Sequence, residues 1–230
     1  MESDKISAES LKYAKAHKRQ IVEKYLSGVP GAEKPLSIFM AGSPGAGKTE
    51  VSKQLLENLS FVGQRFVRID ADELRAECPG YNGANAHLFQ KAVTFLVHEI
   101  HSSALKSGVN FVLDGTFSNF VTQQQNIERS LKRGRDVAVV YVYQTPKVAW
   151  RFIETREKTE GRSVPKSEFL RKSQESVNVT NAIKAHFGSK IRLNLVVKDD
   201  YGNNKYRYAD ICSLDNHLKK AYNEDELDKF

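Results

Sequence analysis

The chain has 230 residues, of which 40% are hydrophobic and 27% charged, and its formal net charge is +7 at pH 7. The length fits one α/β domain with additions better than two domains, and the composition is typical of a globular protein. No apolar stretch is long enough to span a bilayer, and the first residues lack the basic start and apolar core of a secretion signal. We therefore expect a cytoplasmic protein without a membrane partner.

The excess of positive charge has two interpretations. A basic protein can bind nucleic acid, or it can hold polyanionic small molecules in one cleft. The basic residues are dispersed, and their one local cluster, Lys132-Arg133-Arg135, follows a predicted helix, where cations suit the helix dipole. The helix end explains this cluster better than a nucleic-acid patch does, and nucleic acid is not the partner that we expect. The two cysteines, Cys78 and Cys212, are far apart and are expected to be free thiols.

The first segment of the chain, residues 1–33, is expected to be helical over residues 5–27, where apolar side chains recur at helical spacing. Gly28, Pro30 and Gly31 end this helix. The segment precedes the rest of the fold, so it either packs on the domain or regulates it. Residues 34–230 are expected to form a single globular domain.

Strand and helix patterns alternate through this domain. Strands are predicted at residues 36–41, 65–70, 110–114, 137–143 and 191–197, with an edge strand at 205–208. Helices are predicted after residue 49, at 84–106, at 120–132, from Pro146, at 166–186 and, in short form, near the C-terminus, where the tail after Asn223 is expected to fray. The alternation predicts a three-layer α/β sandwich with a mostly parallel sheet. Such sheets bind ligands beyond the carboxyl ends of their strands.

A glycine-rich motif follows the first predicted strand. Its residues match the G-x-x-x-x-G-K-[ST] phosphate-binding loop at every fixed position: Gly42, Ser43, Pro44, Gly45, Ala46, Gly47, Lys48 and Thr49. The glycines let backbone N–H groups surround phosphate oxygens, and the helix N-terminus adds positive charge there. Lys48 is expected to contact the β- and γ-phosphates and Thr49 to ligate Mg²⁺. The chain is therefore predicted to bind a nucleoside triphosphate, ATP or GTP.

Acidic residues follow two other strands at the same edge of the predicted sheet. Asp70 and Asp72 come at the end of the strand at 65–70, and Asp114 ends the strand at 110–114. Phosphoryl transfer to a hydroxyl needs a carboxylate that accepts the acceptor's proton, and often another that organises Mg²⁺. We assign the base to Asp72 and the metal to Thr49, Asp114 and Asp70. Helix capping stays open as an alternative for Asp70 and Asp72, and a strand-ending turn for Asp114.

Two arginines, Arg156 and Arg162, flank a polar segment that could close over a triphosphate. A guanidinium group can stabilise negative charge on a phosphoryl group during its transfer. Composition alone favours a solvated helix end for this segment.

Taken together, these residues resemble the zeta toxin family, P-loop kinases that phosphorylate UDP-N-acetylglucosamine and so block peptidoglycan synthesis. The resemblance runs from about Pro35 to Val197. The loop at 42–49 is similar to the family's loop, and residues 67–74 are similar to its segment after the second strand, in which the second Asp is the proposed base. Residues 108–116 follow the family's order of glycine, apolar strand and acid-Gly-Thr, with Asp114 where Glu is common.

The resemblance implies further roles. Residues 155–157 and 161–166 are similar to the segments that carry the family's γ-phosphate arginines, which makes Arg162 and, with a one-residue shift, Arg156 catalytic alongside Asp72 and Lys48. A substrate-contacting Glu of the family falls on His98 here, with Glu99 adjacent. The residues implied to bind the substrate are Asp72, His98, Glu99 and Thr116.

Family members are neutralised by a helical antitoxin that blocks the ATP site. The resemblance therefore implies an antitoxin partner, or an N-terminal helix that acts in cis.

The sequence thus predicts a P-loop kinase-like α/β fold and an ATP- or GTP-dependent phosphotransferase that uses Mg²⁺ and UDP-N-acetylglucosamine. Two alternatives stay open: a P-loop kinase that acts on another acceptor, such as a dinucleotide, an antibiotic hydroxyl or a nucleic-acid end, and a nucleotide-dependent interaction module.

Overall fold

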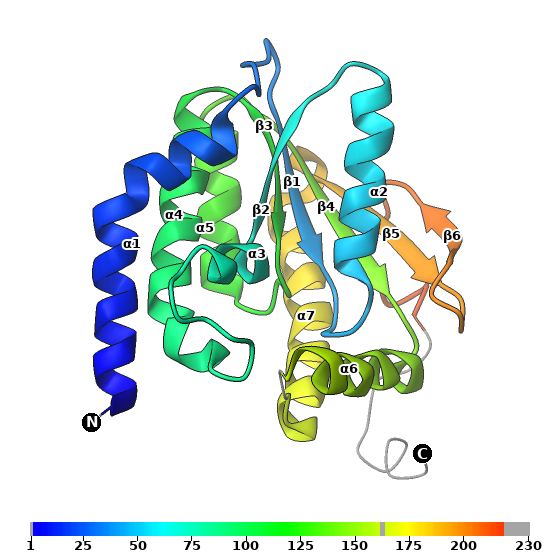
Figure 1. The fold of residues 1–230 in the computed structure, drawn as a ribbon. Coiled ribbons are helices and arrows are strands. Elements are labelled where there is room, and N and C mark those ends of the chain that lie inside the picture. The colour runs from blue at the N-terminus through cyan, green and yellow to red at the C-terminus, as the bar shows by residue number, and fades with distance from the viewer. Residues whose placement is uncertain (1, 162–163, 219–230) are drawn as a thin grey trace.

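The computed structural model of the protein describes residues 2–161 and 164–218 (Figure 1). In chain order its elements are α1 (Glu2–Leu26), β1 (Leu36–Ala41), α2 (Lys48–Phe61), β2 (Phe66–Asp70), α3 (Ala71–Ala76), the 3₁₀ helix η1 (Ala86–Phe89), α4 (Gln90–Lys106), β3 (Asn110–Asp114), α5 (Phe120–Leu131), β4 (Asp136–Tyr143), α6 (Pro146–Glu160), α7 (Lys166–Phe187), the 3₁₀ helix η2 (Gly188–Lys190), β5 (Arg192–Lys198) and β6 (Asn204–Tyr208). The predicted fraying of the tail after Asn223 lies outside the described residues.

The strands form one sheet in the order β2-β3-β1-β4-β5-β6, parallel except for β6, which pairs antiparallel with β5 at the edge. The predicted three-layer α/β fold is confirmed. Since β1 lies between β3 and β4, the loop that follows β1 has the ends of β2 and β3 on one side and those of β4 and β5 on the other.

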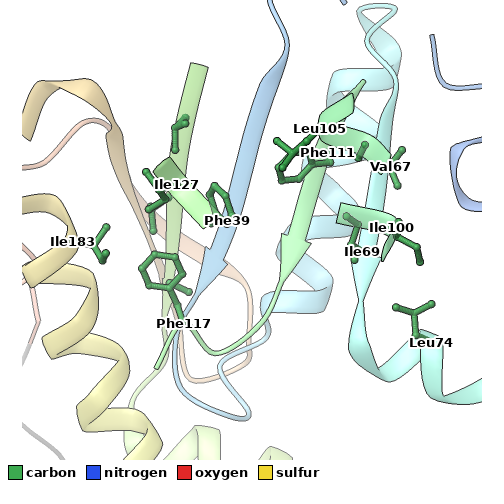
Figure 2. Packing of buried hydrophobic residues seen from close by; sticks show 14 of the residues in the cluster. Phe39, Val67, Ile69, Leu74, Ile100, Leu105, Phe111, Phe117, Ile127 and Ile183 are labelled. Carbon is green, nitrogen blue, oxygen red and sulfur yellow. The ribbon is translucent and has the colours of Figure 1, made fainter. Parts of the chain in front are cut away.

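The two faces of the sheet carry separate apolar layers, because successive strand residues point to opposite faces. On β1, Ile38 and Met40 pack in a cluster with Val51 of α2, whereas Phe39 and Ala41 join the larger cluster under α1, α4, α5 and α7. Figure 2 shows part of this larger cluster, in which Phe39 lies with residues of β3, α5 and α7. The sheet is therefore buried on both faces, as parallel sheets usually are.

The predicted helix at 84–106 is shorter than expected. The structure has η1 at Ala86–Phe89, and the α-helix begins only at Gln90. The preceding segment closes a turn in which Asn82 and Asn85 exchange side-chain and backbone hydrogen bonds, with Gly83 in the left-handed region. Asparagine side chains that bond to nearby backbone compete with helix, which explains the later start.

One residue of the basic cluster after α5, Arg135, differs from the interpretation as a helix-end feature. Arg135 is only 3% exposed, and it donates to the carbonyl oxygen of Val109 at 2.7 Å and to the hydroxyl of Ser37 at 2.7 Å. This arginine joins three strands at the amino ends of the sheet and is a structural residue. Within the described ranges, none of the helices is both long and apolar enough to cross a membrane.

Helix α1 packs along α4 (Figure 1) and contributes Ala14 and Ile21 to the larger core cluster. Ion pairs flank this contact, from Lys18 to Glu99 at 3.4 Å and from Lys24 to Glu77 at 2.6 Å. Of the apolar positions that predicted the helix, Ala14 and Ile21 are thus buried against the domain, and Val22, Tyr25 and Leu26 are half-buried against the same cluster. Its regulatory role stays a prediction.

We predict that Ala14→Asp lowers the free energy of unfolding by about 2–4 kcal/mol, because it buries an unpaired carboxylate at a fully buried position. Urea unfolding followed by circular dichroism measures this change. Lys15→Asp, at the exposed neighbouring position, is the control and should change stability little. Equal stability of the two variants would contradict the packing of α1 on the core.

Candidate active site

The phosphate-binding loop follows a path that requires glycine at two positions. Gly42 has a φ of 140°, and a Cβ there would lie 2.4 Å from the carbonyl oxygen of Val142. Gly45 has a φ of 74°, and a Cβ there would lie 2.2 Å from the carbonyl oxygen of Ala149. The loop therefore packs its backbone directly against β4 and α6, which only glycine allows.

Lys48, the first residue of α2, reaches back over this loop. Its Nζ donates hydrogen bonds to the carbonyl oxygens of Gly42 at 3.0 Å and Ser43 at 2.7 Å. Burial lowers the pKa of Lys48 to about 8, against the opposing effect of carboxylates, of which Asp114 has the largest. An anion bound at the N-terminus of α2 would restore the charged form of this lysine.

Ser176 of α7 ties the loop to the end of β3. Its hydroxyl accepts a hydrogen bond from the N–H of Gly42 at 3.0 Å and donates one to the carbonyl oxygen of Thr116 at 2.7 Å. The next residue, Phe117, has a φ of 59° and a buried ring, so the chain changes direction directly after Thr116. Thr116 thus lies beside the start of the phosphate-binding loop.

Arg68 lies between two facing carboxylates. Asp70 on β2 is paired in register with Asp114 on β3. The guanidinium of Arg68 donates to Oδ2 of Asp114 at 2.9 Å and to the Ser52 hydroxyl at 3.0 Å, and it also pairs with Asp70 and Glu73. Because the side chains of Arg68, Asp70 and Asp114 are each 10% exposed or less, their ion pairs are shielded from water, and the guanidinium offsets the repulsion between the two carboxylates.

Asp70 uses both of its carboxylate oxygens inside the protein. Oδ1 accepts from the N–H of Asp72 at 2.8 Å and so caps α3, while Oδ2 pairs with Arg68. Burial raises the pKa of Asp70 above its usual range, and the facing Asp114 adds to the rise. The structure therefore shows the capping alternative for Asp70, and its metal-ligand role stays a prediction.

Asp72 lies between two arginines from different helices. Its Oδ2 accepts from Nη2 of Arg156 of α6 at 3.0 Å, and its Oδ1 pairs with Arg75 of α3. Arg75 is itself 5% exposed and donates to Oε1 of Gln90, the first residue of α4, at 2.9 Å. Arginines of α3 and α6 thus hold the two oxygens of the Asp72 carboxylate, and α4 holds one of these arginines.

The structure places His98 and Glu99 elsewhere. Their side chains contact each other at 3.5 Å, Glu99 also pairs with Lys18 of α1, and the His98 side chain is 63% exposed. Within the parts of the chain that the structure describes, neither contacts Asp72 or the phosphate-binding loop. Their role in substrate binding stays a prediction. Arg162 lies outside the described residues.

A magnesium ion fits the residues at the loop only together with a nucleotide. In the described ranges no group of three or more His, Cys, Asp or Glu side chains could hold a metal ion. Magnesium is commonly held by one or two protein oxygens together with phosphate oxygens and water. The Asp114 carboxylate at the end of β3 is tied to α2, which carries Thr49, because the Ser52 hydroxyl donates to its Oδ2 at 3.0 Å. The roles of Thr49 and Asp114 as metal ligands stay predictions.

Three residues of this site were not predicted: Arg68, Arg75 and Ser176. Arg68 had a detectable signal, because it is a charged residue inside the apolar strand that ends at Asp70. Arg75 and Ser176 lie in helical segments whose sequence does not distinguish them from ordinary polar positions.

Comparison with known protein families identifies a match to one family model. The family model described as zeta toxin matches residues 21–209, which run from the last turns of α1 past the end of β6. No curated protein matches the sequence.

Solved structures of similar fold include a chain of the PezAT chromosomal toxin–antitoxin system of Streptococcus pneumoniae. It is 16% identical with a TM-score of 0.66, and the match covers 84% of this chain and 79% of that one. A chain of the AvrRxo1-ORF1:-ORF2 complex with ATP is 15% identical with a TM-score of 0.57, and the match covers 89% of this chain and 65% of that one. At these identities the likeness supports the fold.

The family model and the geometry of the phosphate-binding loop together indicate a nucleotide-dependent phosphotransferase of the P-loop kinase class. The matched region contains the loop, Asp72, Asp114 and Arg156, which the fold brings to one edge of the sheet. The chain belongs to the zeta toxin family.

Proposed function

We propose that this protein transfers the γ-phosphoryl group of ATP or GTP to a hydroxyl of UDP-N-acetylglucosamine. The observation that carries the proposal is the Asp72 carboxylate, held by Arg75 and Arg156 at the same edge of the sheet as Lys48 and its loop. A fixed carboxylate beside a triphosphate site is what a kinase needs to activate an acceptor hydroxyl. The acceptor itself is inferred from the family.

In this mechanism the backbone N–H groups of the loop and Lys48 hold the β- and γ-phosphates. Thr49 and Asp114 would hold Mg²⁺, which neutralises phosphate charge when it is bound with the nucleotide. Asp72 accepts the proton of the acceptor hydroxyl while the oxygen of that hydroxyl bonds to the γ-phosphorus. The bond from the γ-phosphorus to the oxygen that bridges the β- and γ-phosphates breaks, and the nucleoside diphosphate leaves.

Arg156 has a second role in this proposal. In the structure it pairs with Asp72 across the gap between α6 and α3. We propose that a bound triphosphate draws this guanidinium towards the γ-phosphoryl group, where it stabilises the charge of the transition state. Arg162 is proposed to act beside it.

An inhibitory protein partner is part of the proposal. The PezAT chain comes from a toxin–antitoxin system. Helix α1 lies along α4, whereas the phosphate-binding loop lies at the base of α2, near α6 (Figure 1). This separation favours inhibition by a separate protein over inhibition by α1 in cis. Without such a partner, phosphorylation of the sugar nucleotide is expected to inhibit cell-wall synthesis.

We predict that Asp72→Asn lowers the rate of transfer by about 100-fold or more, because the amide cannot accept the acceptor's proton. Binding of Mg²⁺·ATP should change little, since the phosphates are held by the loop. The measurement uses nucleotide labelled at the γ-phosphate and follows the label into UDP-N-acetylglucosamine. Glu57→Gln, an exposed change on α2, is the control and should keep wild-type transfer. Full transfer by Asp72→Asn would remove the base assignment.

We also predict that nucleotide affinity falls as the pH rises above about 8, because Lys48 then loses its proton in the free protein. The lowered pKa means that the charged lysine is fully present below this pH and is lost above it. Binding at pH 9 should therefore take up protons, which calorimetry in buffers of different ionisation enthalpy detects.

The matched control for this pH dependence is Lys48→Arg, which keeps its charge up to much higher pH. If this variant binds nucleotide, its affinity should be flatter between pH 7 and 9. An unchanged pH dependence in Lys48→Arg would assign the effect to another group.

A further inference from the structure

Lys198, the last residue of β5, is a buried lysine beside the phosphate-binding loop. It is 8% exposed, and it follows Val196 on the face of the sheet that α2 covers. The pairing of β5 with β6 shifts register between Val197 and Lys198. Irregular pairing of this kind often redirects a side chain next to a functional site.

The side chain of Lys198 packs on Gly47, the residue that precedes the helix carrying Lys48. A Cβ at Gly47 would lie 2.4 Å from Nζ and 3.2 Å from Cδ of Lys198. The same point is 3.3 Å from Oε2 of Glu50. The absence of a side chain at Gly47 therefore makes room for the lysine as well as for the turn of the loop.

The ammonium group of Lys198 has no hydrogen bond or ion pair with any residue in the ranges that the structure describes. Burial lowers its pKa, and the nearby carboxylates of Glu50 and Asp199 oppose this only in part. Most of the side chain is buried, whereas Nζ keeps contact with solvent and is open to a ligand. An unpaired ammonium group beside a loop that is proposed to bind phosphate fits a contact with a bound ligand.

The order of the strands in the sheet indicates which end of a bound nucleotide Lys198 would contact. From the loop after β1, the Asp72 and Asp114 carboxylates lie on the side of β3 and β2, and Lys198 lies on the side of β4 and β5. In the proposed function the γ-phosphate faces Asp72. The nucleoside then leaves the loop on the opposite side, towards the end of β5.

We propose that Lys198 is a ligand of the bound nucleotide on its nucleoside side, where its ammonium group donates to an acceptor atom of the ribose or the base. This inference rests on the proposed function for the direction in which the nucleotide lies. It identifies the end of β5 as the place where the protein distinguishes a nucleoside triphosphate from an inorganic polyphosphate.

The test compares the wild-type protein with Lys198→Met, which keeps most of the length of the side chain and removes its charge. Dissociation constants are measured for Mg²⁺·ATP, Mg²⁺·GTP and Mg²⁺·tripolyphosphate. Lys53→Met is the matched control, because it removes the same charge from an exposed position on α2.

We expect Lys198→Met to bind the preferred nucleotide about tenfold or more weakly, as for the loss of a charged hydrogen bond, and to bind tripolyphosphate as the wild type does. Lys53→Met should bind all three ligands as the wild type does. Without a ligand, the Tm of Lys198→Met should be close to that of the wild type, because the substitution keeps most of the buried stem and removes no hydrogen bond or ion pair within the described residues.

Wild-type nucleotide affinity in Lys198→Met would overturn the inference and leave the proposed function intact. Equal loss of nucleotide and tripolyphosphate, or a lower Tm with loss of all binding, would assign Lys198 to the phosphates or to the loop's structure and would also overturn it. If Lys198→Met does not fold, Lys198→Gln supplies the same comparison.

The two proposals can also fail separately. If the variant loses only nucleotide binding and the wild-type protein transfers no phosphoryl group, the inference is supported and the proposed function is contradicted. Failure of the wild type to bind either nucleotide would contradict both.

Discussion

The arrangement of this site depends on charge compensation at the carboxyl ends of the sheet. Parallel pairing sets Asp70 directly opposite Asp114, and two facing carboxylates in a buried position repel each other. Arg68 offsets this repulsion from within the sheet, which leaves Asp70 able to cap α3. The cap in turn fixes the start of the helix that carries Asp72. The position of the proposed base therefore follows from an ion pair two strands away from the phosphate-binding loop.

Most of the fold could be predicted because its signals are local. The strands are apolar runs, the loop has glycines where φ is positive and the backbones touch, and Pro146 begins α6 at the expected place. The start of α4 was predicted too early, because the side-chain bonds of Asn82 and Asn85 that prevent a helix there depend on the turn they form. The buried role of Arg135 depends on partners from β1 and from the residue just before β3, far away in sequence.

The position of a residue at this edge of the sheet could be predicted where a motif fixes both residue and spacing, as for Lys48 and Asp72, whose roles stay predictions. It was not predictable where the partner comes from a distant element. In the sequence, Ser176 and Arg75 look like ordinary polar helix residues. Only the fold shows that the Ser176 hydroxyl joins the loop to Thr116 and that the Arg75 guanidinium pairs with Asp72. Lys198 is a similar case, since only the sheet order places it beside Gly47. Long-range packing thus decides which polar residues of a P-loop protein belong to its active site.

We infer above all that the Asp72 carboxylate, with Arg75 and Arg156 beside it, forms an acceptor site for a sugar nucleotide. The most direct measurement is the mass of the products after the purified protein is incubated with Mg²⁺·ATP or Mg²⁺·GTP and a panel of acceptors that includes UDP-N-acetylglucosamine. The account predicts the gain of one phosphoryl group on UDP-N-acetylglucosamine, and no gain with Lys48→Ala. A phosphorylated product from another acceptor, with UDP-N-acetylglucosamine unchanged, would contradict it.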